Sequence, residues 1–295
     1  MSFFDINKQL YSVHRIENGI SIMDYPTSNF DLAGTLQKTL ASRYNLKADF
    51  ALNKIHECLS REEVDKHLED SGHWHDPLQT LGAPMIEAYY KFVHWLSDHL
   101  GFDFVFEHNP LVRYHIPAKL DDRYRLPDGE LFTHHSDTLL GDYFQQINIW
   151  LPFCDVKNTG ALSVCSRTAS INTLKTFAQE QGYTYDEYKE SRVAFFDYAK
   201  QRPQLMADLR TDAMPTNLRY GQCLMFDPRI LHGTAENVEI MTRVSMDFRI
   251  VPMDAYESII KELERQGRRP NSYEGEGLIK GEFYNALTAR EIIKN

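Results

Sequence analysis

The sequence predicts a mainly β protein with flanking helices, and two changes of hydrophobic periodicity along the chain are the evidence. Apolar residues follow helical spacing before residue 103, alternate with polar residues from 103 to 253, and return to helical spacing after Pro252. Six alternating segments are predicted to be strands: FVFEHN, LVRYHIP, YFQQINIWLPF, GALSVC, QCLMFD and TRVSMDFRIVP. Short strands separated by turns favour a sandwich or barrel, with helices available to cover a sheet.

We expect one domain over residues 1–295, because no repeat or low-complexity linker divides the chain. It has three predicted parts: an N-terminal hairpin and helices (1–102), a β core (103–253) and C-terminal helices (254–295). A helical insertion at 168–212 interrupts the core and is a natural lid.

Local signals support the helical parts. Asn18-Gly19 predicts the hairpin, because both residues tolerate positive φ. Residues 31–100 are predicted to be helical, with a capping-box pattern at Ser60 and Glu63. Beyond Pro252, the segment AYESIIKELERQG continues the helical pattern, and we expect a second short helix near the C-terminus.

The composition narrows the classes of partner. A net charge of −10 disfavours binding to a nucleic-acid backbone, and no apolar run reaches the ~18 residues of a membrane span. The sequence starts without a recognisable signal peptide, and its four cysteines form no CxxC pair. We therefore expect a cytoplasmic protein that acts on a small molecule; the oligomeric state is left open.

The stretch LFTHHSDTLL contains the first candidate metal ligands. In a strand, residues two apart face the same side, so His135 and Asp137 would project together and His134 would point away. A histidine and a carboxylate at this spacing supply two ligands of the 2-His-1-carboxylate triad that holds Fe(II). A lone HxD is equally compatible with an ordinary polar turn.

His232 is the candidate third ligand. It follows the predicted strand QCLMFD, precedes Gly233, and is the only histidine after His135. The competing cluster GHWHD, with His73, His75 and Asp76, lies in the helical region with no strand to fix it. We expect that cluster to consist of surface residues.

The strand TRVSMDFRI adds a charged group to the core. Arg243 and Ser245 would share one face, opposite Val244, Met246 and Phe248. A buried guanidinium needs an anionic partner, and its planar fork suits a carboxylate.

Taken together, His135-x-Asp137, His232-Gly233 and Arg243-x-Ser245 resemble the Fe(II)/2-oxoglutarate-dependent oxygenases, in particular the phytanoyl-CoA dioxygenase branch with its natural-product and amino-acid hydroxylases. The segments INIWLPFCDVKNTGALSVC and YGQCLMFDPRILHGT also look like that branch. The resemblance implies a double-stranded β-helix (jelly roll, cupin-like) core. It also implies that His135, Asp137 and His232 hold Fe(II), and that Arg243 and Ser245 bind the far carboxylate of 2-oxoglutarate. A substrate would be oxidised by O2 with release of succinate and CO2.

Further roles follow from position within this scheme. Related halogenases need a small residue where Asp137 stands, so a carboxylate favours hydroxylation, desaturation or cyclisation. Gln146 and Asn148 share a strand face and are predicted to contact 2-oxoglutarate, although that face could also meet water. Arg113 and Arg167 are candidate substrate contacts or surface ion pairs.

Two other functions are compatible with a metal-binding jelly roll. A cupin-like metal-dependent isomerase usually has a richer histidine set and would not explain Arg243-x-Ser245. A non-catalytic ligand-binding jelly roll would not need an intact triad. We expect a dioxygenase of specialised metabolism that acts on a polar small molecule.

Overall fold

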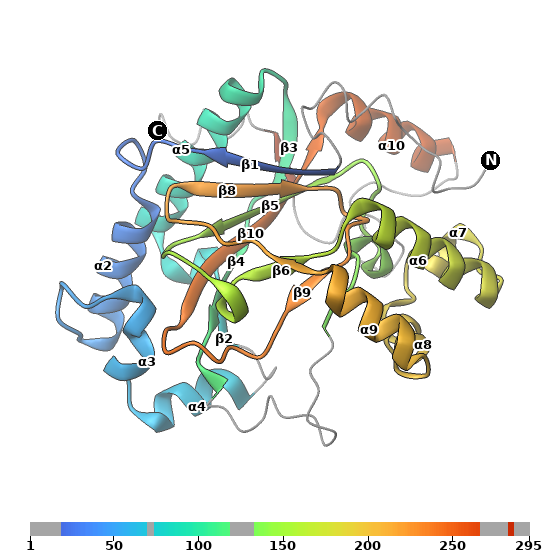
Figure 1. The fold of residues 1–295 in the computed structure, drawn as a ribbon. Coiled ribbons are helices and arrows are strands. Elements are labelled where there is room, and N and C mark those ends of the chain that lie inside the picture. Colours follow the sequence, from blue (N-terminus) through green and yellow to red (C-terminus); the bar gives the residue numbers. More distant parts are fainter. Residues whose placement is uncertain (1–18, 70–73, 119–132, 266–282, 286–295) are drawn as a thin grey trace.

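The computed structural model describes residues 19–69, 74–118, 133–265 and 283–285, and its centre is an eight-stranded antiparallel sheet (Figure 1). The strands along its main path are β1 (Ile20–Asp24), β8 (Gln222–Phe226), β5 (Ile147–Pro152), β10 (Arg243–Pro252), β3 (Phe104–Glu107) and β11 (Phe283–Asn285). A branch adds β4 (Leu111–His115), which pairs with β10 and β2 (Trp74–Pro77). A second sheet has three strands, β7 (Met214–Pro215), β6 (Leu162–Val164) and β9 (His232–Thr234).

The strands of the large sheet have two different faces. On β10, Val244, Met246 and Phe248 belong to an apolar core that the sheet shares with the N-terminal helices. On β5 and β8, Trp150 and Leu224 face the other way and pack with residues of the small sheet. The alternation predicted for these strands is confirmed, and it leaves Arg243 and Ser245 on the side away from the helices.

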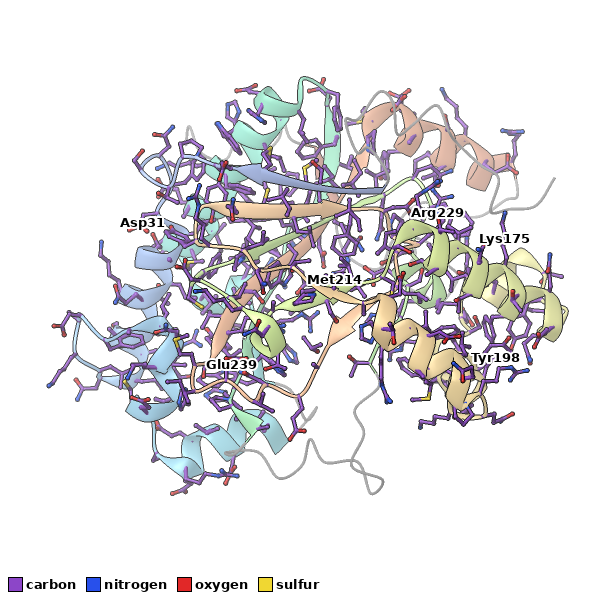
Figure 2. All side chains as sticks on the ribbon, in the orientation of Figure 1. Asp31, Lys175, Tyr198, Met214, Arg229 and Glu239 are labelled. Carbon is purple, nitrogen blue, oxygen red and sulfur yellow. The ribbon has the colours of Figure 1, made fainter. Side chains whose placement is uncertain are left out.

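The N-terminal helices support the large sheet from that first side. They are α2 (Leu32–Tyr44), α3 (Ile55–Cys58), α4 (Arg61–Glu69) and α5 (Ala83–Leu100). Asp31, labelled in Figure 2, caps α2 by accepting a hydrogen bond from the backbone of Gly34. The same carboxylate accepts a hydrogen bond from the hydroxyl of Tyr220, which fixes α2 to the turn before β8.

The predicted helical insertion is present between β6 and β7. It forms α6 (Arg167–Gln181), α7 (Tyr185–Tyr188), α8 (Arg192–Lys200) and α9 (Pro203–Asp212), on the opposite side of the sheets from α2 and α4 (Figure 1). Its apolar side chains, among them Leu174, Phe177 and Phe195, form a separate cluster. Figure 2 shows Lys175 and Tyr198 on this insertion.

After β10 the chain continues into α10 (Met253–Arg265). None of the described helices is long and apolar enough to cross a membrane.

Three expectations about local structure need correction or lie outside the described residues. The region 31–100 is not wholly helical, because β2 pairs with β4 and Trp74 stacks on Tyr114 with ring centroids 4.3 Å apart. The C-terminal part is not all helix, since β11 pairs with β3. In both places pairing with a distant strand overrides the local pattern. The first strand of the expected hairpin lies outside the described residues, although Gly19 has a φ of 81°.

Candidate metal centre

Two histidines from distant parts of the chain lie side by side across an antiparallel bridge. His232 is the first residue of β9, and His135 pairs with it outside any named strand. The backbone N–H of His135 donates to the carbonyl of His232 at 3.0 Å, and the reverse bond is 2.9 Å long. Opposed residues of such a pair project to the same face, and the two imidazole centroids lie 4.8 Å apart.

Asp137 joins the pair from a short 3-10 helix rather than from a strand. This helix, η6 (Asp137–Leu140), begins after Ser136, whose hydroxyl oxygen accepts a hydrogen bond from the backbone of Thr138. The N–H of Asp137 donates to the carbonyl of Pro228 at 3.0 Å. The strand predicted at HxD is therefore a single bridge residue followed by a turn. The Asp137 carboxylate nevertheless lies on the same side as the His135 ring.

The neighbouring histidine points away from this cluster. His134 Nε2 lies 2.8 Å from the hydroxyl oxygen of Ser163 on β6. Burial lowers the pKa of His134 to about 4, so its ring is neutral at ordinary pH. Of the two adjacent histidines, only His135 faces Asp137 and His232.

The three side chains fit a divalent metal ion. Oδ1 of Asp137 lies 3.6 Å from Nε2 of His135 and 3.5 Å from Nε2 of His232. Each histidine places Nδ1 within 2.9 Å of a backbone carbonyl, so Nδ1 carries the proton and Nε2 keeps its lone pair. Within the described part of the chain, buried Oδ1 accepts no hydrogen bond. Two imidazoles and one carboxylate are the donor set of non-haem Fe(II) sites.

The protonation states also suit metal binding. Burial lowers the pKa of His135 to about 4, which leaves the ring in its neutral, ligating form. Burial alone would raise the pKa of Asp137, but the positive charge of Arg249 and the hydrogen bond it donates outweigh burial and lower that pKa. Asp137 is therefore ionised at neutral pH.

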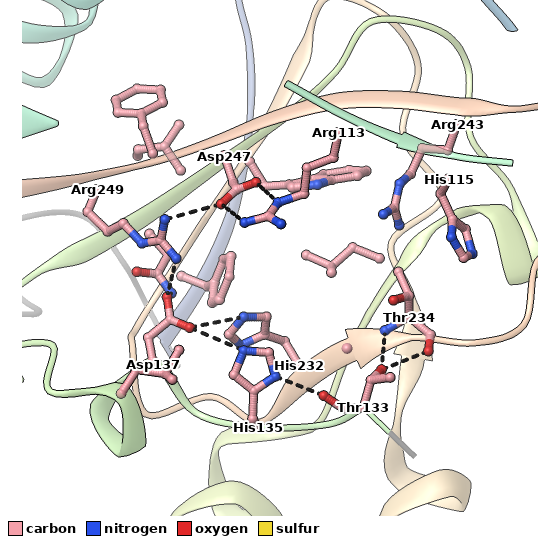
Figure 3. Close-up of a pocket in the computed structure, with 18 of the residues that line it drawn as sticks. Arg113, His115, Thr133, His135, Asp137, His232, Thr234, Arg243, Asp247 and Arg249 are labelled. Atoms are coloured by element: carbon pink, nitrogen blue, oxygen red, sulfur yellow. Dashed lines mark hydrogen bonds and ion pairs between the residues drawn. The ribbon is translucent and has the colours of Figure 1, made fainter. Parts of the chain in front are cut away.

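A cavity of about 300 Å³ lies between the two sheets, with the triad on the side of the small sheet (Figure 3). Its other wall comes from β4, β5, β8 and β10, with Arg113, Trp150, Phe226 and Arg243 among the lining residues. The volume is at the lower end of the range for small-molecule sites.

Arg243 is a buried cation on the wall that faces the triad. It lines the cavity, and its guanidinium carbon lies 5.9 Å from the centre of the Trp150 ring. Ser245, two residues further along β10, is fully buried. Among the described residues its hydroxyl makes no hydrogen bond. This pair is suited to bind an anion that enters the cavity.

Sequence comparison now identifies the family. The family model for "Phytanoyl-CoA dioxygenase (PhyH)" matches residues 36–243, which is more than half of the chain and includes the triad and Arg243. The chain belongs to the PhyH family. It is an Fe(II)/2-oxoglutarate-dependent dioxygenase, and iron and 2-oxoglutarate are its cofactor and cosubstrate.

Solved structures give weaker similarities. The 2-oxoglutarate-dependent epimerase SnoN from nogalamycin biosynthesis is 12% identical, with a TM-score of 0.46 over 82% of this chain and 81% of that one. HygX from Streptomyces hygroscopicus, with nickel and 2-oxoglutarate bound, is 10% identical with a TM-score of 0.46 over 84% and 88%. Similarities at this level assign no role to any residue. No curated protein matches the sequence.

Strand β10 of this PhyH protein also carries a charged pair, Asp247 and Arg249, that the sequence pattern alone did not reveal. Arg113 donates two hydrogen bonds to Asp247, and Arg249 donates one to Asp247 at 3.1 Å and one to Asp137 Oδ2 at 3.1 Å (Figure 3). Asp247 and Arg249 follow Arg243 and Ser245 at spacing two. Extending the same alternation by four residues places them on the same strand face as Arg243 and Ser245, but it does not give their partners on other elements.

Two of the residues predicted to contact 2-oxoglutarate make other contacts. Asn148 lines the cavity, but its amide N–H donates to Asp137 Oδ2 at 2.9 Å. Gln146 is buried and does not line the cavity; it donates to Asp142 and to Asn148. Their shared strand face is therefore turned inward, as predicted. Their hydrogen bonds, however, are directed at the metal ligand and its surroundings.

The two candidate substrate arginines are separated in space. Arg113 lines the cavity. Arg167 begins α6 and does not line it, and its side chain lies against Gly19 at the start of β1. The structure therefore leaves Arg167 without a geometric link to the site. The expectation that the rival cluster lies at the surface is wrong for Asp76, which is buried on β2 and forms an ion pair with Arg43 at 2.9 Å. His73 lies outside the described residues.

The lack of space around residue 233 explains why a glycine follows His232. A Cβ at this position would lie 2.7 Å from Thr133 Oγ1 and 2.9 Å from the backbone N of His134. Any larger residue would push away the segment that carries His135.

The loop before His232 is held by a buried ion pair. Arg229, labelled in Figure 2, lies 2.8 Å from Asp227.

Proposed function

We propose that this PhyH enzyme hydroxylates a polar small molecule, or carries out a related desaturation or ring closure, in specialised metabolism. The two sheets would form the double-stranded β-helix of the family. The observation that carries the proposal is the opposition of two sites across one cavity. His135, Asp137 and His232 line one side, and Arg243 lines the other, with Ser245 fully buried two residues further along β10.

The proposal gives separate roles to the metal ligands and to the residues that would bind 2-oxoglutarate. His135, Asp137 and His232 would hold Fe(II), and bound iron with 2-oxoglutarate supplies the oxidising chemistry. Arg243 would bind the far carboxylate of 2-oxoglutarate through its planar fork, and the Ser245 hydroxyl would donate to the same group. Asp137 is a carboxylate rather than a small residue, and this supports hydroxylation over halogenation.

The cavity wall supports a polar substrate. The Arg113 guanidinium is fixed on one edge by Asp247, and its remaining N–H groups donate to no side chain in the described part of the chain, so they could bind a ligand in the cavity. Arg192, at the start of α8, lines the cavity from the helical insertion. We include Arg113 in the proposal as a substrate contact. We do not include Arg167, Gln146 or Asn148 as ligand contacts. Arg167 and Gln146 do not line the cavity, and Asn148 donates its hydrogen bond to Asp137.

The proposal includes a cytoplasmic location and no nucleic-acid or membrane partner. All four cysteines are free, which suits a reducing compartment.

An anaerobic titration tests the function. Metal-free protein is mixed with Fe(II) and then with 2-oxoglutarate, and the visible charge-transfer band of the bound cosubstrate is recorded. We expect the band in the wild type. Succinate release in air would then identify substrates. Metal binding without the band would favour the cupin-like isomerase, and the absence of metal binding would favour a non-catalytic binding protein.

A further inference from the structure

We propose that Arg249 is a positioning residue that keeps Asp137 a one-oxygen ligand of the metal. This inference rests on the proposed function only for the identity of the metal centre. It concerns the outer oxygen of the carboxylate, Oδ2, and the three positions that the triad must leave open.

The two oxygens of Asp137 have different surroundings. Oδ1 points at the two histidine Nε2 atoms and accepts no hydrogen bond from the described residues. Oδ2 accepts one hydrogen bond from Arg249 at 3.1 Å and one from Asn148 at 2.9 Å. A carboxylate held in this way presents Oδ1 to a metal, because turning Oδ2 towards the ion would break two hydrogen bonds.

Arg249 is itself fixed by other acids. Its guanidinium lies 3.1 Å from Asp247, 3.5 Å from Glu107 and 3.8 Å from Asp142. These carboxylates approach from β10, β3 and the turn after η6, so the side chain cannot swing away from Asp137 without losing ion pairs on several elements. Of the two donors to Oδ2, Arg249 is the charged one and the more strongly held.

The consequence concerns the number of open positions. Two histidines and a one-oxygen carboxylate occupy three sites of an octahedral ion and leave three. 2-Oxoglutarate would occupy two of these positions, and the third would remain for O2. A carboxylate that binds through both oxygens would take the last position, so Arg249 protects the site at which O2 has to bind.

Metal affinity alone cannot test this idea. Removing Arg249 takes away an ordering contact, which weakens binding, and also a positive charge near the ion, which strengthens it. The number of water molecules on the bound metal is the direct measure. Bound Mn(II) speeds the relaxation of bulk water protons in proportion to the exchangeable waters it carries.

The experiment loads metal-free wild type, Arg249→Gln and Arg249→Lys with Mn(II) and measures water proton relaxation per bound ion. We expect a loss of about one-third in both variants, because one of about three waters is displaced. Arg249→Lys keeps the positive charge that Asp247, Glu107 and Asp142 require, so it still tests the proposal if Arg249→Gln does not fold.

Arg113→Gln is the matched control. Arg113 belongs to the same ion-pair network, but it donates its hydrogen bonds to Asp247 rather than to Asp137, so the relaxation of this variant should equal that of wild type. Wild-type relaxation in a folded Arg249 variant would overturn the proposal, as would an equal loss in Arg113→Gln. Failure of the wild type to bind Mn(II) would instead refute the metal centre and the proposed function.

Discussion

The cavity side of β10 has two halves that are built in different ways. Arg243, at its start, lines the cavity, and Ser245 is fully buried beside it on the same strand face, with a hydroxyl that makes no hydrogen bond among the described residues. Asp247 and Arg249, further along, are tied into ion pairs with Arg113, Glu107 and Asp137. The first half is arranged to receive a ligand, whereas the charged side chains of the second half already have partners within the protein. One strand thus supplies both a binding site and the support of the metal centre.

This contrast predicts that Asp247→Ala has the largest effect on stability. The change leaves Arg113 without its carboxylate and removes one of the acids around Arg249. Breaking a fully buried pair costs about 3–5 kcal/mol. Because the Arg113 side chain is 37% exposed, we expect about 2–3 kcal/mol after allowing for screening by water.

Urea unfolding of the metal-free proteins measures this cost. Ser245→Ala is the control from the other half of β10, and it should change the free energy of unfolding by less than about 1 kcal/mol. Equal losses in Asp247→Ala and Ser245→Ala would show that the two halves do not differ as we describe.

Arg243→Ala should show the opposite behaviour, with little effect on the metal and a clear effect on the cosubstrate. Loss of a charged hydrogen-bonding partner is worth about 1.5–3 kcal/mol, which corresponds to a roughly 10- to 100-fold weaker affinity for 2-oxoglutarate. The anaerobic Fe(II) titration reports both constants. His135→Ala and His232→Ala are the converse variants, since each removes a metal ligand. A normal affinity for 2-oxoglutarate in Arg243→Ala would refute the role of Arg243.

The same two halves show what can be predicted from the sequence. Alternation placed Arg243 and Ser245 inside, and the pattern of His135, Asp137 and His232 predicted a cluster that the structure brings together. The network of Asp247 and Arg249 was missed, because charged residues in a strand resemble a solvated face until the partner strand is known. The register of β10 with β4 pairs Arg113 with Ser245, which places Asp247 diagonally across from Arg113 on the same face.

Other differences have the same origin in long-range pairing. The turn at Asp137 depends on a hydrogen bond to the distant Pro228, and nothing within LFTHHSDTLL signals it. Strand β2 likewise depends on β4, and Asn148 on β5 donates its hydrogen bond to Asp137 on η6. Periodicity predicts which face a residue takes but not which side chain it will meet there.

Glu107→Gln should have the smallest effect, and one that depends on pH. Burial raises the pKa of Glu107 to about 7, although the positive charge of Arg249 opposes this. An acid whose pKa is raised by folding stabilises the protein fully below its unfolded value of about 4.5, and this contribution is lost as the pH rises through about 7. The glutamine variant has no such proton. The wild type should therefore lose stability relative to Glu107→Gln between pH 5 and 7, by up to about 1.4 kcal/mol per pH unit.

Unfolding of both metal-free proteins at several pH values tests this directly. The shifts of His134 and His135 are common to the two proteins and cancel in the difference. A difference that does not change with pH would mean that Glu107 is ionised throughout. In that case the ion-pair network around Arg249 would carry one more negative charge, from Glu107 on β3, and Arg249 would be held more tightly by Glu107 and less exclusively by Asp247 and Asp137.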